Sequence, residues 1–300
     1  MNLTLGENLN SAKGGLSYSV TVVLYVILNL FVGSIVQSCG LQNTDAGMYI
    51  LYLLSPSAIA VAVAITLYAG KLKPKQVFPV KCKPKYYLIA LLLIFGLMFS
   101  LSTVNGYLVE LLKLLGYNPS TSTLPSFEGW GLVWGLLVIA FIPAVFEEAL
   151  FRGVMLNNVE EDAGTYRAAF IIAFAFSLYH GSVEKTIYQF ICGFAFALLA
   201  LRSRSILPTI IIHFINNALI ILLYAFNLVD DLGNIVMPQW AFITVTVMSA
   251  LSLVAALLLL VFDKSQVKPK KKNGVAPFFI WASVGIIVMA SIWIAGLIGA

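Results

Sequence analysis

Five ionisable side chains lie inside stretches of sequence that are apolar enough to cross a membrane. They are Glu147, Glu148, Arg152 and the two histidines of the chain, His180 and His213. A charged side chain near the centre of a bilayer costs about 2.5–3.5 kcal/mol on the scale derived from insertion experiments. Because such a cost needs a compensating role, these five residues are predicted to form a functional site.

The residue types of this site suit hydrolysis of a peptide bond. Glu147 would act as general base on a water molecule, helped by His180. His213 and Asn217 are four residues apart, so they share one helix face, and they would stabilise the oxyanion of the tetrahedral intermediate. No serine nucleophile is required, and Ser177, the nearest candidate, is expected to hydrogen-bond to the backbone.

Sequence spacing predicts how these side chains lie relative to one another. Two helices are expected to form an antiparallel hairpin around a polar turn that ends at Gly164. Glu147 lies 17 residues before that glycine and His180 lies 16 residues after it. At about 1.5 Å per residue both side chains are then at nearly the same depth. Glu148 and Arg152 share a face and are expected to pair, which leaves the Glu147 carboxylate free.

The composition predicts an all-α protein, a polytopic integral membrane helix bundle of about eight to nine transmembrane helices. Apolar residues make up 60% of the chain and charged residues 10%, and the mean hydropathy is +0.95. We expect a single transmembrane domain over 1–300, with N-terminal spans in 18–104, a catalytic core in 130–227 and C-terminal spans in 240–298. The apolar windows are 18–38, 48–69, 86–104, 130–158, 166–180, 186–201, 206–227, 240–262 and 276–298.

The basic residues predict the orientation of the chain in the membrane. Lys and Arg accumulate in cytoplasmic loops, which places the N-terminus in the cytoplasm and the C-terminus outside. The net charge of +5 comes from clusters at span ends, so we expect contact with anionic lipid and no nucleic-acid partner. Of the 18 basic residues, 15 fall on the cytoplasmic side: Lys13, Lys71, Lys73, Lys75, Lys81, Lys83, Lys85, Arg167, Arg202, Arg204, Lys264, Lys268, Lys270, Lys271 and Lys272.

Three motifs lie in this order on successive helices: Glu147-Glu148-x-x-x-Arg152, Phe176-x-x-x-His180 and His213-x-x-x-Asn217. They resemble the motifs of the CPBP family, also called the Abi family, of intramembrane endopeptidases. The family comprises type II CAAX prenyl proteases and bacteriocin-processing enzymes. The resemblance implies that Glu147 is the catalytic glutamate and that Phe176 packs against the catalytic helix. It also implies a membrane-associated peptide or protein substrate. The short loops are typical of a prokaryotic cell-membrane protein.

Three alternatives to this mechanism remain open from the sequence. No cofactor is expected for glutamate-dependent hydrolysis, but Glu147, His180 and His213 could instead bind a catalytic zinc ion. Carboxylates and histidines in membrane helices also build proton relays, so a proton-coupled transporter is a second alternative. A catalytically inactive binding or immunity protein on the same scaffold is the third.

Overall fold

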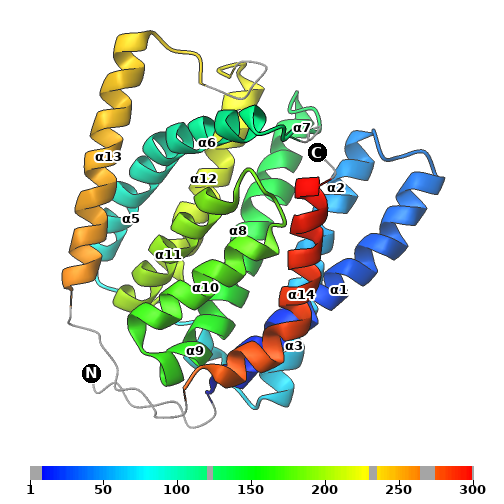
Figure 1. Ribbon diagram of the computed structural model, residues 1–300, viewed down its shortest axis with the longest axis vertical. Coiled ribbons are helices and arrows are strands. Elements are labelled where there is room, and N and C mark those ends of the chain that lie inside the picture. Colours follow the sequence, from blue (N-terminus) through cyan, green and yellow to red (C-terminus); the bar gives the residue numbers. More distant parts are fainter. Residues whose placement is uncertain (1–8, 120–123, 230–234, 264–273, 299–300) are drawn as a thin grey trace.

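The computed structural model of the protein describes residues 9–119, 124–229, 235–263 and 274–298. The last predicted basic cluster, 264–272, lies outside them. Within these ranges the chain is helical and has no β-strand, which confirms the predicted all-α class (Figure 1). The elements are α1 (Ser11–Ser38), α2 (Asp45–Tyr52), α3 (Leu54–Ala69), α4 (Pro74–Val77), α5 (Lys85–Gly96), η1 (Leu97–Leu101), α6 (Ser102–Leu114), α7 (Trp130–Trp134), η2 (Gly135–Phe141), α8 (Ile142–Glu148), η3 (Ala149–Met155), α9 (Leu156–Ala163), α10 (Thr165–Tyr179), α11 (Thr186–Ser203), α12 (Leu207–Ala225), α13 (Gln239–Phe262) and α14 (Ala276–Ile298), where η denotes a π-helical segment.

Eight helices of the described residues are long and apolar enough to cross a membrane. Many of their outward side chains are apolar and exposed, including Leu30 and Phe31 at 68% and 67%. Exposed apolar faces of this extent fit contact with lipid. The chain is therefore a multi-pass integral membrane protein.

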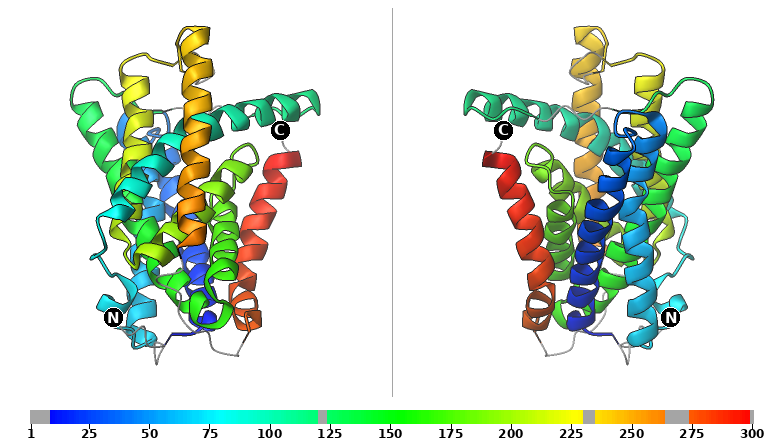
Figure 2. Two further views of the ribbon diagram at one scale, coloured as in Figure 1. Left: turned by 90° about the vertical axis from the view of Figure 1, so that its left-hand side faces the viewer. Right: turned by 90° about the vertical axis from the view of Figure 1, so that its right-hand side faces the viewer.

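The predicted span at 166–180 differs from the other eight. It corresponds to α10, which has 15 residues and is shorter than the other candidate spans. Such a helix rises only about 22 Å, less than the roughly 30 Å of a bilayer core. Nevertheless, α1 begins and α14 ends at opposite ends of the bundle, as an odd number of passages requires (Figures 1 and 2). The α10 helix thus runs where the fifth span was predicted, but it is shorter than the eight candidate spans of the described residues and most of its residues are buried.

The first helix begins seven residues earlier than its apolar window. Ser11 and Ser17 are fully buried, so the polar start of α1 faces protein and not lipid. Asn10 caps the helix by accepting a hydrogen bond from the Lys13 amide. The Ser11 amide donates to Asp162 of α9 at 2.8 Å. These contacts fix the N-terminal end of α1 to α9, which follows the two glutamates of the predicted site.

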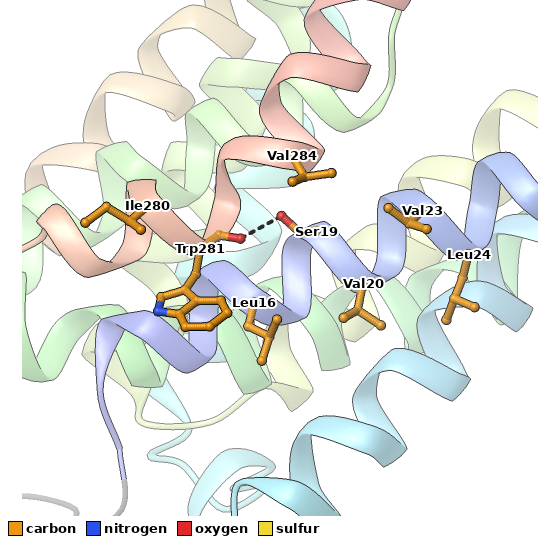
Figure 3. Close-up of a pocket in the computed structure, with 8 residues that line it drawn as sticks. All are labelled: Leu16, Ser19, Val20, Val23, Leu24, Ile280, Trp281 and Val284. Atoms are coloured by element: carbon orange, nitrogen blue, oxygen red, sulfur yellow. Dashed lines mark hydrogen bonds between the residues drawn. The ribbon is translucent and has the colours of Figure 1, made fainter.

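The last helix packs closely along α1. Gly15 of α1 lies against the Phe278 carbonyl of α14, where an added Cβ would come within 2.2 Å of the oxygen. The Ser19 hydroxyl donates to the Trp281 carbonyl at 2.7 Å (Figure 3). On the outward side of this pair, apolar side chains line a shallow groove that contains the Trp281 ring. The close contact places the far half of α14 beside α10 and α11.

One helix runs across the bundle. The α6 helix follows the π-helical segment η1 and lies across the long axis, whereas α13 and α14 run along it (Figure 2). None of its residues is buried.

The helices that carry the predicted site residues form two hairpins. Gly164, with φ 76°, ends α9 and lets α10 turn back beside it, as the predicted turn requires. The α11 helix returns along α10, and α12 follows after a short turn. The glutamates lie on α8 between the π-helical segments η2 and η3. Such segments are frequent at functional sites because they widen the helix and redirect side chains.

Candidate active site

Glu147 lies opposite both histidines. Its Oε2 atom is 3.9 Å from Nε2 of His180 and 3.9 Å from Nε2 of His213. The Glu147 side chain is 11% exposed, and Oε2 accepts no hydrogen bond from the part of the chain that the structure describes. Separations of 3.9 Å exceed hydrogen-bond length, so Glu147 Oε2 lies near both Nε2 atoms without bonding directly to either. The structure therefore places Glu147 and His180 at the same depth.

The other ring nitrogen of each histidine is already engaged. His180 Nδ1 lies 2.8 Å from the Phe176 carbonyl, and His213 Nδ1 lies 2.9 Å from Oε1 of Glu148. A carbonyl and an ionised carboxylate only accept hydrogen bonds, so Nδ1 carries the proton in both rings. In a neutral histidine, Nε2 is then an acceptor directed toward Glu147.

Glu148 and Arg152 form a buried ion pair beside the site. Arg152 Nη1 donates to Oε1 of Glu148 at 2.8 Å, and both side chains are 0% exposed. The guanidinium also lies 4.4 Å from the ring centre of Phe176 and 5.3 Å from that of Phe196, within range of cation–π attraction. Two aromatic faces and a carboxylate thus replace the hydration of the buried cation.

Phe176 lies between the ion pair and His180. Its ring centre is 4.6 Å from the His180 ring and 5.1 Å from Phe151 of the glutamate helix. It also contacts the His213 ring at 6.4 Å. This ring therefore lies between the predicted catalytic side chains and α11, which Gly193 allows to approach α10 closely.

The two asparagines of α12 have different partners. Asn216 accepts a hydrogen bond from the Tyr188 hydroxyl of α11 at 3.3 Å, which links α12 to α11. Asn217 lies one turn after His213 and is half-buried. Its Oδ1 accepts a hydrogen bond from Nδ2 of Asn216 at 3.3 Å. Asn217 and Glu147 are both among the described residues, and no hydrogen bond joins them.

Sequence reasoning missed the bond between Glu148 and His213. It assigned Glu148 to Arg152 alone, but Oε1 of this carboxylate also accepts from His213 Nδ1. No sequence signal specifies this contact, since α12 is placed beside α8 only by tertiary packing. The Ser177 hydroxyl donates to the Thr186 carbonyl at 2.7 Å, so it hydrogen-bonds to the backbone as predicted.

The zinc alternative requires closer ligands than the structure has. Ligand atoms around tetrahedral zinc lie about 3.3 Å apart, because each is about 2.0–2.1 Å from the metal. The two separations at Glu147 are 3.9 Å. Among the described residues, no group of three or more His, Cys, Asp or Glu side chains is arranged to hold a metal ion. The residues do not fit zinc in this arrangement.

The comparisons with known proteins agree with the motifs. Residues 129–219 match the family model described as type II CAAX prenyl endopeptidase, Rce1-like. The matched segment includes α8, α10 and most of α12, and with them all three motifs. No curated protein and no solved structure matches the chain. The resemblance predicted from the motifs is confirmed.

Proposed function

We propose that this chain, whose residues 129–219 match the Rce1-like family of type II CAAX prenyl endopeptidases, hydrolyses peptide bonds by a glutamate-activated water. The family supports a CAAX-type intramembrane protease in general. Our proposal adds the catalytic residues and a substrate class, namely hydrophobic or membrane-associated peptides and proteins. We place the N-terminus in the cytoplasm because of the distribution of basic residues. We place the entrance to the site on the cytoplasmic side as well, because His213 is only the seventh residue of α12, which begins on that side.

One observation carries the proposal, which is the position of Glu147 Oε2 at 3.9 Å from both Nε2 atoms. A water about 2.8 Å from two atoms with this separation makes an angle of about 90° between them, close to its preferred hydrogen-bond angle. The separation therefore suits one water between Glu147 and an imidazole. A carboxylate within hydrogen-bond distance of that water meets the geometric requirement for a general base.

The charges of the buried cluster assign a role to His213. Ionised Glu147 and Glu148 together with Arg152 carry a net charge of −1, which is costly in a low-dielectric site. A second proton on His213, whose Nδ1 already donates to Glu148, makes the cluster neutral. The imidazolium then has an Nε2 proton that can be donated to an oxyanion. Neutral His180 retains its acceptor nitrogen to orient the water.

The reaction then proceeds in two steps. Water attacks the substrate carbonyl carbon as Glu147 removes a proton from it, and the oxyanion is stabilised by His213 and the Asn217 amide. Glu147 next gives this proton to the leaving nitrogen, and the C–N bond breaks. The products are a carboxylic acid and an amine. No metal or organic cofactor takes part in either step.

Replacement of Asn217 with Ala should lower kcat by about 10²-fold with little change in KM, because the lost donor acts on the developing oxyanion. The matched control is Asn216→Ala, which removes the neighbouring amide that contacts Tyr188 and donates to Asn217 Oδ1 but does not contact the oxyanion in our proposal. We expect that control to lose much less activity than Asn217→Ala. Equal losses in the two variants would contradict the oxyanion role of Asn217.

The function is tested with the full-length protein in lipid vesicles. The probes are an internally quenched peptide that ends in a prenylated CAAX sequence and its unprenylated counterpart, each with and without a zinc chelator. Cleavage by the wild type that persists in chelator, and that is lost in Glu147→Ala, is the expected result. Cleavage that is lost in chelator and restored by zinc would replace the glutamate mechanism with a metal mechanism. Cleavage of the prenylated peptide alone would assign prenylated substrates.

A further inference from the structure

His180 is held by a loop and not by the interior of a helix. It follows the last residue of α10, and the next residue, Gly181, has a φ of 60° that turns the chain away. Its ring bonds to the Phe176 carbonyl and its amide to the Ser177 carbonyl, both in the last turns of α10, and on its other side the chain continues into the segment 181–185. A displacement of about 1 Å in a catalytic group can cost roughly 10²-fold in rate. Contacts that hold the 181–185 loop in place therefore influence the position of His180 in the site.

Thr186 joins the two ends of the loop. Its carbonyl accepts from Ser177 in the last turn of α10 at 2.7 Å, and its hydroxyl donates to the Ser182 carbonyl at 2.7 Å. The same hydroxyl oxygen accepts from Nε1 of Trp293 in α14, again at 2.7 Å. Two of these hydrogen bonds lie between residues at the two ends of the loop, and the third connects Thr186 to Trp293 of α14.

Further contacts join the loop to the same part of α14. A Cβ at Gly181 would lie 3.3 Å from both Ile292 and Met289, and Val183 is buried at 6% exposure. On the other side, the Tyr117 hydroxyl donates to Glu184 at 2.6 Å. The α14 helix itself is fixed along α1, as described above. The loop is therefore enclosed by parts of the chain outside the family segment 129–219.

We propose that Trp293 is a positioning residue for catalysis, holding the 181–185 loop through Thr186 so that His180 stays opposite Glu147. This inference rests on the proposed function for its catalytic part. Trp293 does not touch the reacting atoms and acts only through the loop. Its indole N–H is the group required, because the hydrogen bond to Thr186 is the link between α14 and the loop.

The test compares Trp293→Phe with Trp281→Phe in the full-length protein. The first variant removes the N–H and keeps a ring. The second makes the same change on the same helix, where Trp281 is 52% exposed in the groove with α1 (Figure 3). In Trp293→Phe we expect kcat per folded molecule on the quenched CAAX peptide to fall about threefold to tenfold, the effect of one buried hydrogen bond. We expect KM to change less than about twofold, and Trp281→Phe to match the wild type.

A second pair of variants tests the route through Thr186. Thr186→Ser keeps the hydroxyl and should retain activity, whereas Thr186→Val removes both the acceptor for Trp293 and the donor to Ser182 and should lose at least as much as Trp293→Phe. The double variant Trp293→Phe/Thr186→Val should lose no more than Thr186→Val alone, because Thr186→Val already removes the bond to Trp293. Losses that multiply in the double variant would contradict this route.

Hydrogen–deuterium exchange of the peptide covering 177–190 tests the loop without reference to activity. Faster exchange in Trp293→Phe, but not in Trp281→Phe, is expected. Unchanged exchange, or unchanged kcat with Glu147→Gln inactive, would overturn the proposal for Trp293. If Glu147→Gln cleaves like the wild type, the proposed function fails, and the exchange result still decides whether Trp293 holds the loop.

Discussion

Replacement of Glu147 with Gln should lower kcat by about 10²- to 10⁴-fold, the contribution typical of general acid–base catalysis. An amide has almost the shape of a carboxylate but cannot accept the proton from water. Folding should be unaffected, because Glu147 Oε2 accepts no hydrogen bond among the described residues. The measurement is kcat on the quenched CAAX peptide, with thermal unfolding in detergent as the check on folding.

The matched control for this variant is Glu148→Gln on the next residue. Glu148 holds Arg152 and His213, so its replacement should lower the amount of folded protein as well as activity. A contrast between a stable inactive Glu147 variant and an unstable Glu148 variant is therefore expected. If Glu147→Gln retained cleavage, the general-base assignment would be wrong.

Replacement of Arg152 with Ala should destabilise the protein by about 3–5 kcal/mol, the usual cost of removing one partner of a buried ion pair. Glu148 would remain buried without the Arg152 guanidinium that donates to it. The aromatic rings that face the guanidinium would also lose their partner. The measurements are the yield of folded protein from membranes and its unfolding temperature.

The double variant Glu148→Gln/Arg152→Met separates charge from packing. It removes both charges and keeps similar volumes, so folding should recover relative to Arg152→Ala. Activity should stay low, because His213 loses the Glu148 carboxylate to which its Nδ1 donates. A well-folded and fully active Arg152→Ala protein would refute the pairing as a requirement of the site.

Long apolar helices could be predicted closely from sequence. The windows at 240–262 and 276–298 correspond to α13 and α14, because lipid contact on most sides makes their composition uniformly apolar. Prediction was poorer where a helix end faces protein. The start of α1 was missed because its buried serines lower the hydropathy, although the Ser17 hydroxyl donates to the Gly14 carbonyl and the Ser11 amide to Asp162. The π-helical segments around the glutamates have no signal in the sequence.

The sequence could predict that Glu147 and His180 face each other, because both lie on one hairpin with a fixed rise per residue. It could not predict contacts between helices that are far apart in the sequence. The bond from His213 to Glu148 depends on how α12 packs on α8, and the bond from Trp293 to Thr186 spans 107 residues. Local periodicity contains no information on either pairing.

The central claim is most directly tested by comparing protein and peptide termini in membranes of cells that express the wild type or Glu147→Gln at equal levels. Mass spectrometry of these termini detects cleavage of any substrate present in the membrane. Our account predicts new termini in hydrophobic or membrane-associated proteins with the wild type only, unchanged when a zinc chelator is present. Identical termini in the two samples would contradict it and would favour a transporter or an inactive binding protein on this scaffold.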